Sequence, residues 1–435
     1  MSQQLLLTGQ VLRFVADPFE VPPEQAVRWD EAIVIENGRI MAIGAIDALS
    51  GPNQHRVDYG QHVICAGFVD AHVHYPQTAI IASWGKRLID WLNTYTFPEE
   101  SRFSDPAYAA LISNRYLDLA IAHGTTTMAS FCTSHAVSVD AFFEAAGARN
   151  MCVVTGKTCM DRNAPHAVLD TAQTAYDDSL ALLTRWHGTG RAHYAITPRF
   201  SPTSTPEQLQ ALGALWAAHP SCLMQTHLSE QVDEVAWVQQ LFPKARDYLD
   251  TYEQFGLLGA RGIYGHAIHL QPREVDQLAE HTAAIAHCPT SNSFIGSGLC
   301  DVTGLKTRGI PVGLATDTGG GSSFSMLRTM AACYEVGQLR GAVLHAAQLM
   351  YLATQGAARA LHLQDQIGNI ALEHMADLVI LDMASTPAIA QRNAHANSLW
   401  EQLFTTIMMG DDRAIADTYI AGKRVAPNAF DSTQP

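Results

Sequence analysis

Several features that define other classes of protein are missing from this sequence of 435 residues. It has no apolar run long enough to cross a bilayer, and its beginning has no basic segment followed by an apolar core. Neither a membrane span nor a secretion signal is therefore expected. Basic residues form no cluster, and 42 acidic against 27 basic residues give a net charge of −15. This balance argues against nucleic acid or an anionic membrane as a partner.

Paired cysteines and three short motifs are also absent. The eight cysteines are scattered and none forms a C-x-x-C pair, so we expect reduced, buried thiols and a cytoplasmic location. The lack of H-E-x-x-H excludes a helix-borne protease zinc site, and the lack of P-C-x-x-C excludes a zinc site of the cytidine-deaminase type. No G-x-G-x-x-G follows the first strand of the central region, which disfavours a doubly wound dinucleotide-binding sheet.

The order of apolar and polar segments divides the chain into three regions. Residues 1–63 and 376–435 contain short β-like pieces, whereas residues 64–375 alternate apolar strands with helical stretches. This alternation predicts an α/β fold, a (β/α)8 barrel of the TIM type, whose functional residues follow the C-terminal ends of the strands. Both termini together are expected to form one small β-sandwich domain. The candidate strands lie near residues 64–74, 125–131, 151–158, 193–199, 222–228, 262–267, 283–288 and 311–317.

The most informative motif is the run GFVDAHVH at residues 67–74, in which an apolar strand ends in two histidines. Alternation along a strand places His72 and His74 on one face with Phe68 and Asp70, and the remaining residues of the run on the other. Neutral imidazole is the commonest protein ligand for zinc and similar metals. The pair is therefore a candidate for two ligands of one metal ion.

Four later strands end in polar residues at the same edge of the predicted barrel. The same alternation leads to Arg199, His227, His266 and Asp317, and it pairs Tyr264 with His266 on one face. Burying a charged or imidazole group is costly unless the group is paired or bound to metal. Together these residues predict a metal site rather than unrelated buried polar groups.

These residues and several longer motifs resemble the amidohydrolase superfamily. The resemblance rests on GFVDAHVH, on His227, His266 and Asp317, and on the closing segment MADLVILD at residues 375–382, so it extends over nearly the whole chain. It implies the same barrel with a small β-sandwich built from both termini. Closer motifs are similar to those of the members that deaminate guanine: HYPQ (74–77), DWLNTYTFPEE (90–100), MDRNAP (160–165), TPRFSPTS (197–204), THLSE (226–230) and HCPTSN (287–292).

The resemblance implies one metal ion per chain. Two-metal members bridge their ions with a modified lysine at the end of the fourth strand, where this chain has Arg199. Lys157 ends the third candidate strand and is expected to be a salt-bridged structural residue. The implied donor set fits zinc, with iron as an open alternative. The expected ligands are His72, His74, His227 and Asp317.

By the same resemblance, Glu230, His266 and Asp317 carry catalysis. Glu230 would take a proton from water and give it to N3 of a purine ring; its alternative role is that of an acid at a helix N-terminus. His266 would stay off the metal and, with Asp317, steer the attacking hydroxide to the ring carbon that bears the amine. The alternative for His266 is a structural histidine.

Substrate recognition is assigned to four residues: Gln77, Trp84, Arg199 and Phe200. Arg199 offers donors that suit the 6-oxo group of guanine, and it cannot accept a hydrogen bond from the 6-amino group of adenine. Gln77 can both donate and accept. Phe200 and Trp84 are candidate faces for the flat ring, or else ordinary packing aromatics.

The resemblance thus implies hydrolysis of guanine to xanthine and ammonia, with a small purine as the partner and a homodimer as the assembly. Two neighbouring residues, Asp70 and His287, are expected to orient the metal ligands. The nearest alternative is a related mononuclear ring deaminase that acts on another purine, a pterin or a triazine. Two-metal hydrolysis of a cyclic amide and a barrel that has lost its metal are more distant alternatives.

Overall fold

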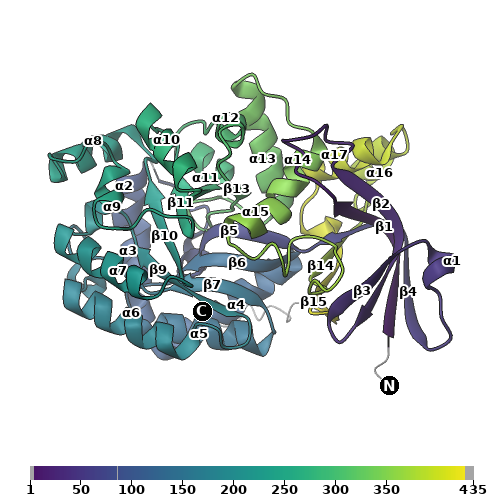
Figure 1. The fold of residues 1–435 in the computed structure, drawn as a ribbon, viewed down its shortest axis with the longest axis horizontal. Helices are drawn as coiled ribbons and strands as arrows, with labels where there is room; N and C mark the ends of the chain where they lie inside the picture. The colour runs from purple at the N-terminus through teal and green to yellow at the C-terminus, as the bar shows by residue number, and fades with distance from the viewer. Residues whose placement is uncertain (1–3, 86, 427–435) are drawn as a thin grey trace.

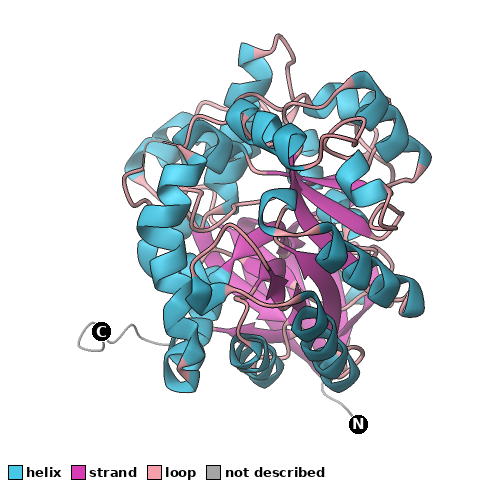
Figure 2. Cartoon of the chain, turned by 90° about the vertical axis from the view of Figure 1, so that its left-hand side faces the viewer, coloured by secondary structure: helices cyan, strands magenta, loops and turns pink. Residues whose placement is uncertain are grey.

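A barrel of eight parallel strands forms the centre of the computed structural model, which describes residues 4–85 and 87–426. The strands run through the larger body in Figure 1, and Figure 2 shows helices around them. Their order is β13-β12-β11-β10-β9-β7-β6-β5, with β8 (Thr158–Cys159) beside β9. The arrangement confirms the predicted (β/α)8 barrel. The eight strands are β5 (Phe68–His74), β6 (Thr125–Phe131), β7 (Cys152–Gly156), β9 (Ala192–Pro198), β10 (Leu223–Leu228), β11 (Gly262–His266), β12 (Ala284–His287) and β13 (Val312–Leu314).

The barrel closes between its first strand and the segment that follows its last. The backbone N–H of Asp317 donates to the carbonyl of His72 at 3.0 Å, and the N–H of His74 donates to the carbonyl of Thr318 at 2.6 Å. Both bonds lie at the C-terminal end of the strands. The ends of the chain of strands therefore meet at the edge where the sequence places the site.

Helix starts follow recognisable signals in the sequence. Asp105 caps α4 (Pro106–Ala122) and Thr205 caps α7 (Pro206–Ala218), and in each case proline takes a first-turn position. No helix among the described residues is both long and apolar enough to cross a membrane. The other helices are α1 (Ile46–Leu49), α2 (Leu88–Trp91), α3 (Phe97–Glu100), α5 (Ala136–Ala148), α6 (Ala172–Trp186), α8 (Val232–Leu241), α9 (Asp250–Glu253), α10 (Pro272–Glu280), α11 (Pro289–Phe294), α12 (Val302–Thr307), α13 (Met326–Leu339), α14 (Ala346–Leu352), α15 (Gln355–Ala360), α16 (Pro387–Asn393) and α17 (Leu399–Met409).

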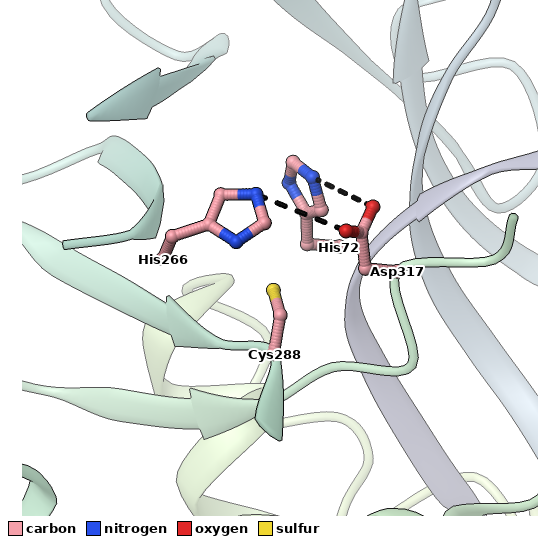
Figure 3. Close-up of side chains that lie close together, drawn as sticks. All are labelled: His72, His266, Cys288 and Asp317. Carbon is pink, nitrogen blue, oxygen red and sulfur yellow. Dashed lines mark ion pairs between the residues drawn. The ribbon is translucent and has the colours of Figure 1, made fainter. Parts of the chain in front are cut away.

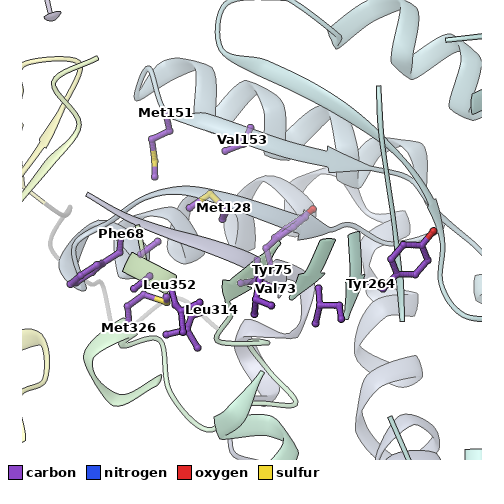
Figure 4. Close-up of a cluster of buried hydrophobic side chains, with 14 of the residues drawn as sticks. Phe68, Val73, Tyr75, Met128, Met151, Val153, Tyr264, Leu314, Met326 and Leu352 are labelled. Carbon is purple, nitrogen blue, oxygen red and sulfur yellow. The ribbon is translucent and has the colours of Figure 1, made fainter. Parts of the chain in front are cut away.

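Two hydrophobic clusters pack on opposite faces of the barrel strands. The inner cluster takes small side chains from seven of the strands, among them Ala71, Ala195 and Ile263. Side chains from so many strands can meet only inside the barrel. The outer cluster lies between strands and helices and includes Phe68, Val73, Met128, Val153, Tyr264 and Leu314 (Figure 4). Residues of the inner cluster therefore face the inside of the barrel, and residues of the outer cluster face the surrounding helices.

The two ends of the chain combine in a second sheet, as predicted. Its seven strands are hydrogen-bonded in the order β16-β15-β14-β4-β1-β2-β3, and only β1 and β4 run parallel. The pairing is thus one continuous mixed sheet. Residues 64–66, predicted to open the first barrel strand, instead end β4. The domain boundaries at residues 63/64 and 375/376 stay a prediction. The strands are β1 (Gln4–Phe14), β2 (Val27–Glu36), β3 (Arg39–Gly44), β4 (Gln54–Ala66), β14 (Leu378–Leu381), β15 (Ile415–Ile420) and β16 (Lys423–Val425).

Substituting Gly213 in α7 by alanine should destabilise the fold. An added Cβ would lie 1.8 Å from the backbone oxygen of Phe255, which cannot move aside as a side chain can. We expect the free energy of unfolding to fall by more than about 1 kcal/mol, measured by urea unfolding. Gly147 in α5 is the matched control, because its Cβ would meet nothing within 4 Å. There alanine should stabilise by up to about 1 kcal/mol, and equal effects at both positions would contradict the packing.

Candidate metal centre and active site

A cavity opens at the C-terminal end of the barrel strands. Its apolar wall comes mostly from the segment after β5 and consists of Leu88, Trp91, Leu92, Phe200 and Ile295. Polar side chains from β5, β10, β11 and the segments after β9 and β13 line the rest. The cavity therefore receives groups from many strands, as expected of the functional end of such a barrel.

An irregularity in β5 aims both of its histidines into the barrel. Ala71 belongs to the inner cluster, so simple alternation would turn His72 outward. The register between β5 and β6 shifts within residues 70–73, and this bulge lets His72 and His74 both face inward. Phe68 packs in the outer cluster. The prediction that the histidines share its face is wrong, although they do reach the site.

The backbone conformation at His266 departs from the regular alternation that was predicted for this strand. Tyr264 packs in the outer cluster and its hydroxyl donates to the carbonyl of Leu257. Regular alternation would leave His266 on that outer face, but its φ of +67° turns the imidazole into the site. The predicted shared face of Tyr264 and His266 is therefore wrong. Nδ1–H of His266 donates to Oδ1 of Asn292 at 2.8 Å, which fixes the orientation of the ring.

Asp317 lies on the segment after β13, not within the strand as predicted. Strand pairing ends at Leu314, and Asp317 has a left-handed φ of +49°. The carboxylate of Asp70 holds the start of this segment, because it accepts hydrogen bonds from the backbone N–H of Thr316 at 2.9 Å and from its hydroxyl at 2.5 Å. Burial raises the pKa of Asp70 to about 7. Asp70 thereby fixes the backbone that carries Asp317.

His227 and its neighbours are packed around one aromatic ring. Nδ1–H of His227 donates to the carbonyl of Arg199 at 2.7 Å, which leaves Nε2 without a proton. The ring of Phe131, at the end of β6, has centroid distances of 4.9, 4.7 and 4.7 Å to the rings of His72, His74 and His227. One buried phenyl ring therefore limits the rotation of three imidazoles. Strand alternation alone had not marked Phe131 as part of the site.

The spacing of four donor atoms fits a single metal ion. His74 Nε2 lies 3.1 Å from His227 Nε2, and Asp317 Oδ1 lies 3.5 Å from the Nε2 atoms of both His72 and His74. Four donors bound at about 2.0–2.1 Å to one tetrahedral ion are separated by about 3.3 Å. Nε2 of His72 has no hydrogen-bond partner among the described residues. The structure thus groups the donor atoms of His72, His74 and His227, and it places the Asp317 carboxylate beside His72 and His74.

Protonation states at this centre also suit a cation. Burial lowers the pKa of His72, His74 and His227, so each imidazole is neutral, the form that binds metal. Burial alone would raise the pKa of Asp317, but the neighbouring imidazoles of His72 and His266 outweigh it, and this pKa is lowered. Three neutral nitrogen donors and one carboxylate therefore face one point.

A second group of possible ligands overlaps the first and contains a thiol. Figure 3 shows Cys288 beside His72, His266 and Asp317. Burial raises the pKa of the Cys288 thiol well above its usual range, and Sγ donates to the carbonyl of Ala286 at 3.5 Å. The thiolate, not the thiol, is the form that binds metal, and this group shares His72 with the first. His287, on the other side of the strand end, has no hydrogen-bond partner for either ring nitrogen among the described residues.

Glu230 lies two residues beyond the end of β10 with its carboxyl at the cavity. Oε1 accepts a hydrogen bond from the hydroxyl of Ser297 at 2.8 Å, and Oε2 lies 3.6 Å from Nε2 of His266. Burial raises the pKa of Glu230 to about 7. The capping of α8 is performed by Glu234, which accepts from the N–H of Gln231. Glu230 is therefore free of the helix-capping role and can exchange a proton near neutral pH.

Arg199 and Gln77 both line the cavity and are joined by a residue that sequence reasoning missed. The carboxylate of Glu100, at the end of α3, accepts from Nη1 of Arg199 at 2.7 Å and from Nε2 of Gln77 at 3.0 Å. All three side chains are buried. Glu100 is the last residue of the motif DWLNTYTFPEE, but the sequence of this motif does not indicate the contact with Arg199 and Gln77.

The two aromatic residues predicted to contact a ring lie in different surroundings. Phe200 is buried at the cavity, with its ring centroid 6.3 Å from that of His227. The side chain of Trp84 is 79% exposed and is not part of the cavity wall. Trp91, seven positions later, lines the cavity in its place. The cavity wall therefore contains Trp91 instead of the predicted Trp84.

Lys157 forms an ion pair with a carboxylate outside the candidate metal site. Its Nζ lies 2.6 Å from Oδ2 of Asp170, and its side chain is buried. The expectation of a salt-bridged structural lysine is met. With Arg199 at the end of the fourth strand and Lys157 engaged, neither of these two positions supplies a bridging group for a second ion.

The sequence matches a known family over most of its length. A family model described as the amidohydrolase family matches residues 63–425. The guanine deaminase of Escherichia coli strain K12 is 42% identical over 418 residues, which cover 95% of this chain and 95% of that protein. The match therefore includes both the barrel and most of the terminal sheet.

Solved structures agree with this match. The structure of E. coli guanine deaminase has a TM-score of 0.93 with 39% identity, covering 99% of this chain and 100% of that one. The guanine deaminase from C. acetobutylicum, solved with guanine bound in its active site, has a TM-score of 0.88 with 26% identity and covers 97% and 100%. The likeness extends over the complete fold.

Substituting Gly265 by alanine should weaken metal binding. An added Cβ would lie 2.9 Å from Cε1 of His72, closer than real Cβ contacts allow, so the imidazole would have to shift. We expect metal affinity to fall by about 10- to 100-fold, measured by competition with a chelator. Gly147→Ala, in open space on α5, serves as the control. Unchanged affinity in Gly265→Ala would contradict the placement of His72 as a ligand.

Proposed function

Because this chain belongs to the amidohydrolase family, we propose that it hydrolyses guanine to xanthine and ammonia. The observation that carries the proposal is that one cavity is lined by three of the four proposed metal ligands, by the carboxyl of Glu230 and by the side chains of Arg199 and Gln77. The relatives at 42% and 37% identity, named guanine deaminase and probable guanine deaminase, support the choice of substrate.

The proposed cofactor is one zinc ion per chain, with iron as the alternative. Neutral imidazoles and a single carboxylate form a donor set that suits zinc. A bound ion of this kind supplies Lewis acidity, which lowers the pKa of a water molecule from about 15.7 toward about 7. The ligands would be His72, His74, His227 and Asp317.

Glu230 moves the proton in the proposed reaction. Its carboxyl takes a proton from the attacking water and gives it to N3 of the ring, which makes the carbon bearing the amino group more electrophilic. The water oxygen bonds to this carbon, the remaining proton of that oxygen passes to the amino group, and the carbon–nitrogen bond breaks, so that ammonia leaves and the ring keeps the proton at N3. A pKa of about 7 supports both proton transfers near neutral pH.

His266 and Asp317 orient the attacking water. Nδ1 of His266 is occupied by Asn292, so its Nε2, 3.8 Å from Oδ2 of Asp317, is the nitrogen that faces the reacting groups. The charges of Glu230 and Asp317 raise the pKa of His266 against the effect of burial. A protonated Nε2 can donate to the water while the carboxylate accepts from it.

Recognition of the purine is proposed to come from Arg199, Gln77 and Phe200. The guanidinium donates to the 6-oxo group, and the phenyl ring packs against the base. Trp91 takes the part first assigned to Trp84, because it belongs to the cavity wall. A deaminase of another purine, a pterin or a triazine is not favoured, because the similar proteins reported above are named for guanine.

We further propose a homodimer that works in the cytoplasm. All eight cysteines are free and buried, which supports a reducing compartment. The dimer rests on the family resemblance alone. Size-exclusion chromatography with light scattering measures the assembly directly, and a mass near 47.3 kDa would contradict it.

Incubation of guanine with the zinc-loaded protein should convert its ultraviolet spectrum to that of xanthine and release one ammonia per base. Removing the metal with a chelator should abolish turnover, because the water is then no longer activated, and adding zinc back should restore it. An unchanged guanine spectrum with metal-loaded protein would refute the substrate assignment and leave the fold intact.

Glu230→Gln should lower kcat by about 10²–10⁴-fold, since an amide cannot accept and return the proton. Zinc content, measured by elemental analysis, should stay at one equivalent, because Glu230 is not a proposed ligand. Glu207→Gln, an exposed carboxyl in the first turn of α7, provides the control and should retain full activity. Substantial turnover by Glu230→Gln would remove its role in proton transfer.

A further inference from the structure

A buried carboxylate joins the two polar side chains that line the recognition side of the cavity. Glu100 has no exposed surface, and its two oxygens are shared out: Oε2 accepts from Nη1 of Arg199 at 2.7 Å, and Oε1 accepts from Nε2 of Gln77 at 3.0 Å. The three residues come from α3, from the segment after β9 and from the turn after β5. One side chain thus connects three separate parts of the cavity wall.

The carboxylate determines which way the amide of Gln77 points. A carboxylate can only accept hydrogen bonds, so the NH2 group of Gln77 must face Glu100. The amide oxygen is then directed to the other side, where the N–H of Gly319 lies 3.4 Å away. Without Glu100, the amide could turn over and exchange its donor for its acceptor. Gln77 therefore presents a fixed acceptor because Glu100 holds its NH2 group.

Glu100 also fixes the guanidinium of Arg199. One of its five N–H donors is held by the carboxylate, and the ring of Phe97, on the same short helix, lies 5.5 Å from its central carbon. A planar guanidinium held at one corner and along one face keeps its remaining donors in a defined direction. The charge of Arg199 is balanced within the wall, so those donors can face a neutral ligand.

We propose that Glu100 is a positioning residue that sets the donor and acceptor pattern read by the site, so that Arg199 offers a donor and Gln77 an acceptor. This inference rests on the proposed function. Guanine carries the complementary pair at neighbouring ring positions, an acceptor at the 6-oxo group on C6 and a donor at N1–H. The base 2-aminopurine has the same amino group at the same carbon but neither of these two groups.

The test compares guanine with 2-aminopurine in Glu100→Gln. Losing the fixed pattern should lower kcat/KM for guanine by about 10- to 100-fold. The constant with which 2-aminopurine competes with guanine should change by less than about threefold, because this base does not use the pattern. A purely structural role would weaken both bases alike. Preference for guanine is thus the readout that identifies positioning.

The adjacent Glu99 offers a matched control. It is also a buried carboxylate on α3, but it contacts Arg102 at 3.0 Å and the hydroxyl of Tyr108, away from the cavity. Glu99→Gln should leave both constants unchanged. If Glu100→Gln does not fold, Glu100→Asp retains the charge with a shorter reach that cannot span Gln77 and Arg199 together, and the same selective loss is expected.

Two failures are distinguishable. A wild-type protein that does not deaminate guanine would refute the proposed function, and the inference would fall with it. A wild-type protein that does so, combined with parallel losses for both bases in the Glu100 variants or with no loss for guanine, would overturn the role of Glu100 alone. If Glu100→Gln retains the wild-type preference for guanine, Glu100 does not position Arg199 and Gln77.

Discussion

The closing contact of the barrel is the constraint on which the remaining structure depends. The carbonyl of His72 and the N–H of His74 bond the backbone at Asp317 and Thr318, and Asp70 holds the residue before them. Three of the four proposed metal ligands thus belong to the segments that join the first barrel strand to the end of the last. Convergence of the ligands is not added to the fold; it is a result of how the barrel closes.

Sequence reasoning identified the barrel strands and polar residues that the structure places at their C-terminal ends, but not how the side chains reach that end. Strand alternation works where the backbone is regular, as for His227. It fails in β5, where a bulge reverses the faces, and at His266, where a left-handed φ does so. Both irregularities depend on pairing and closure across the whole barrel. A periodicity of two, read within a single strand, contains no information about them.

The recognition side was harder to predict for another reason. Much of it comes from the segment between β5 and α4, which consists of short helices and turns without a clear period. Trp84 and Trp91 both stand in this segment, and composition cannot tell which one faces inward. Glu100 was equally hidden, because a glutamate in a helix is usually solvated. Its importance comes from two partners that only the folded chain brings to it.

The contact between the first barrel strand and the end of the last has a consequence for how the protein folds during its synthesis. Asp70 and Thr316 are 246 positions apart, so a chain emerging from the ribosome exposes His72 and His74 long before Asp317 has been synthesised. Contacts of such separation form late in folding. A shortened or half-folded chain would hold its imidazoles apart from Asp317, and metal capture would then report that synthesis and folding of the barrel are complete.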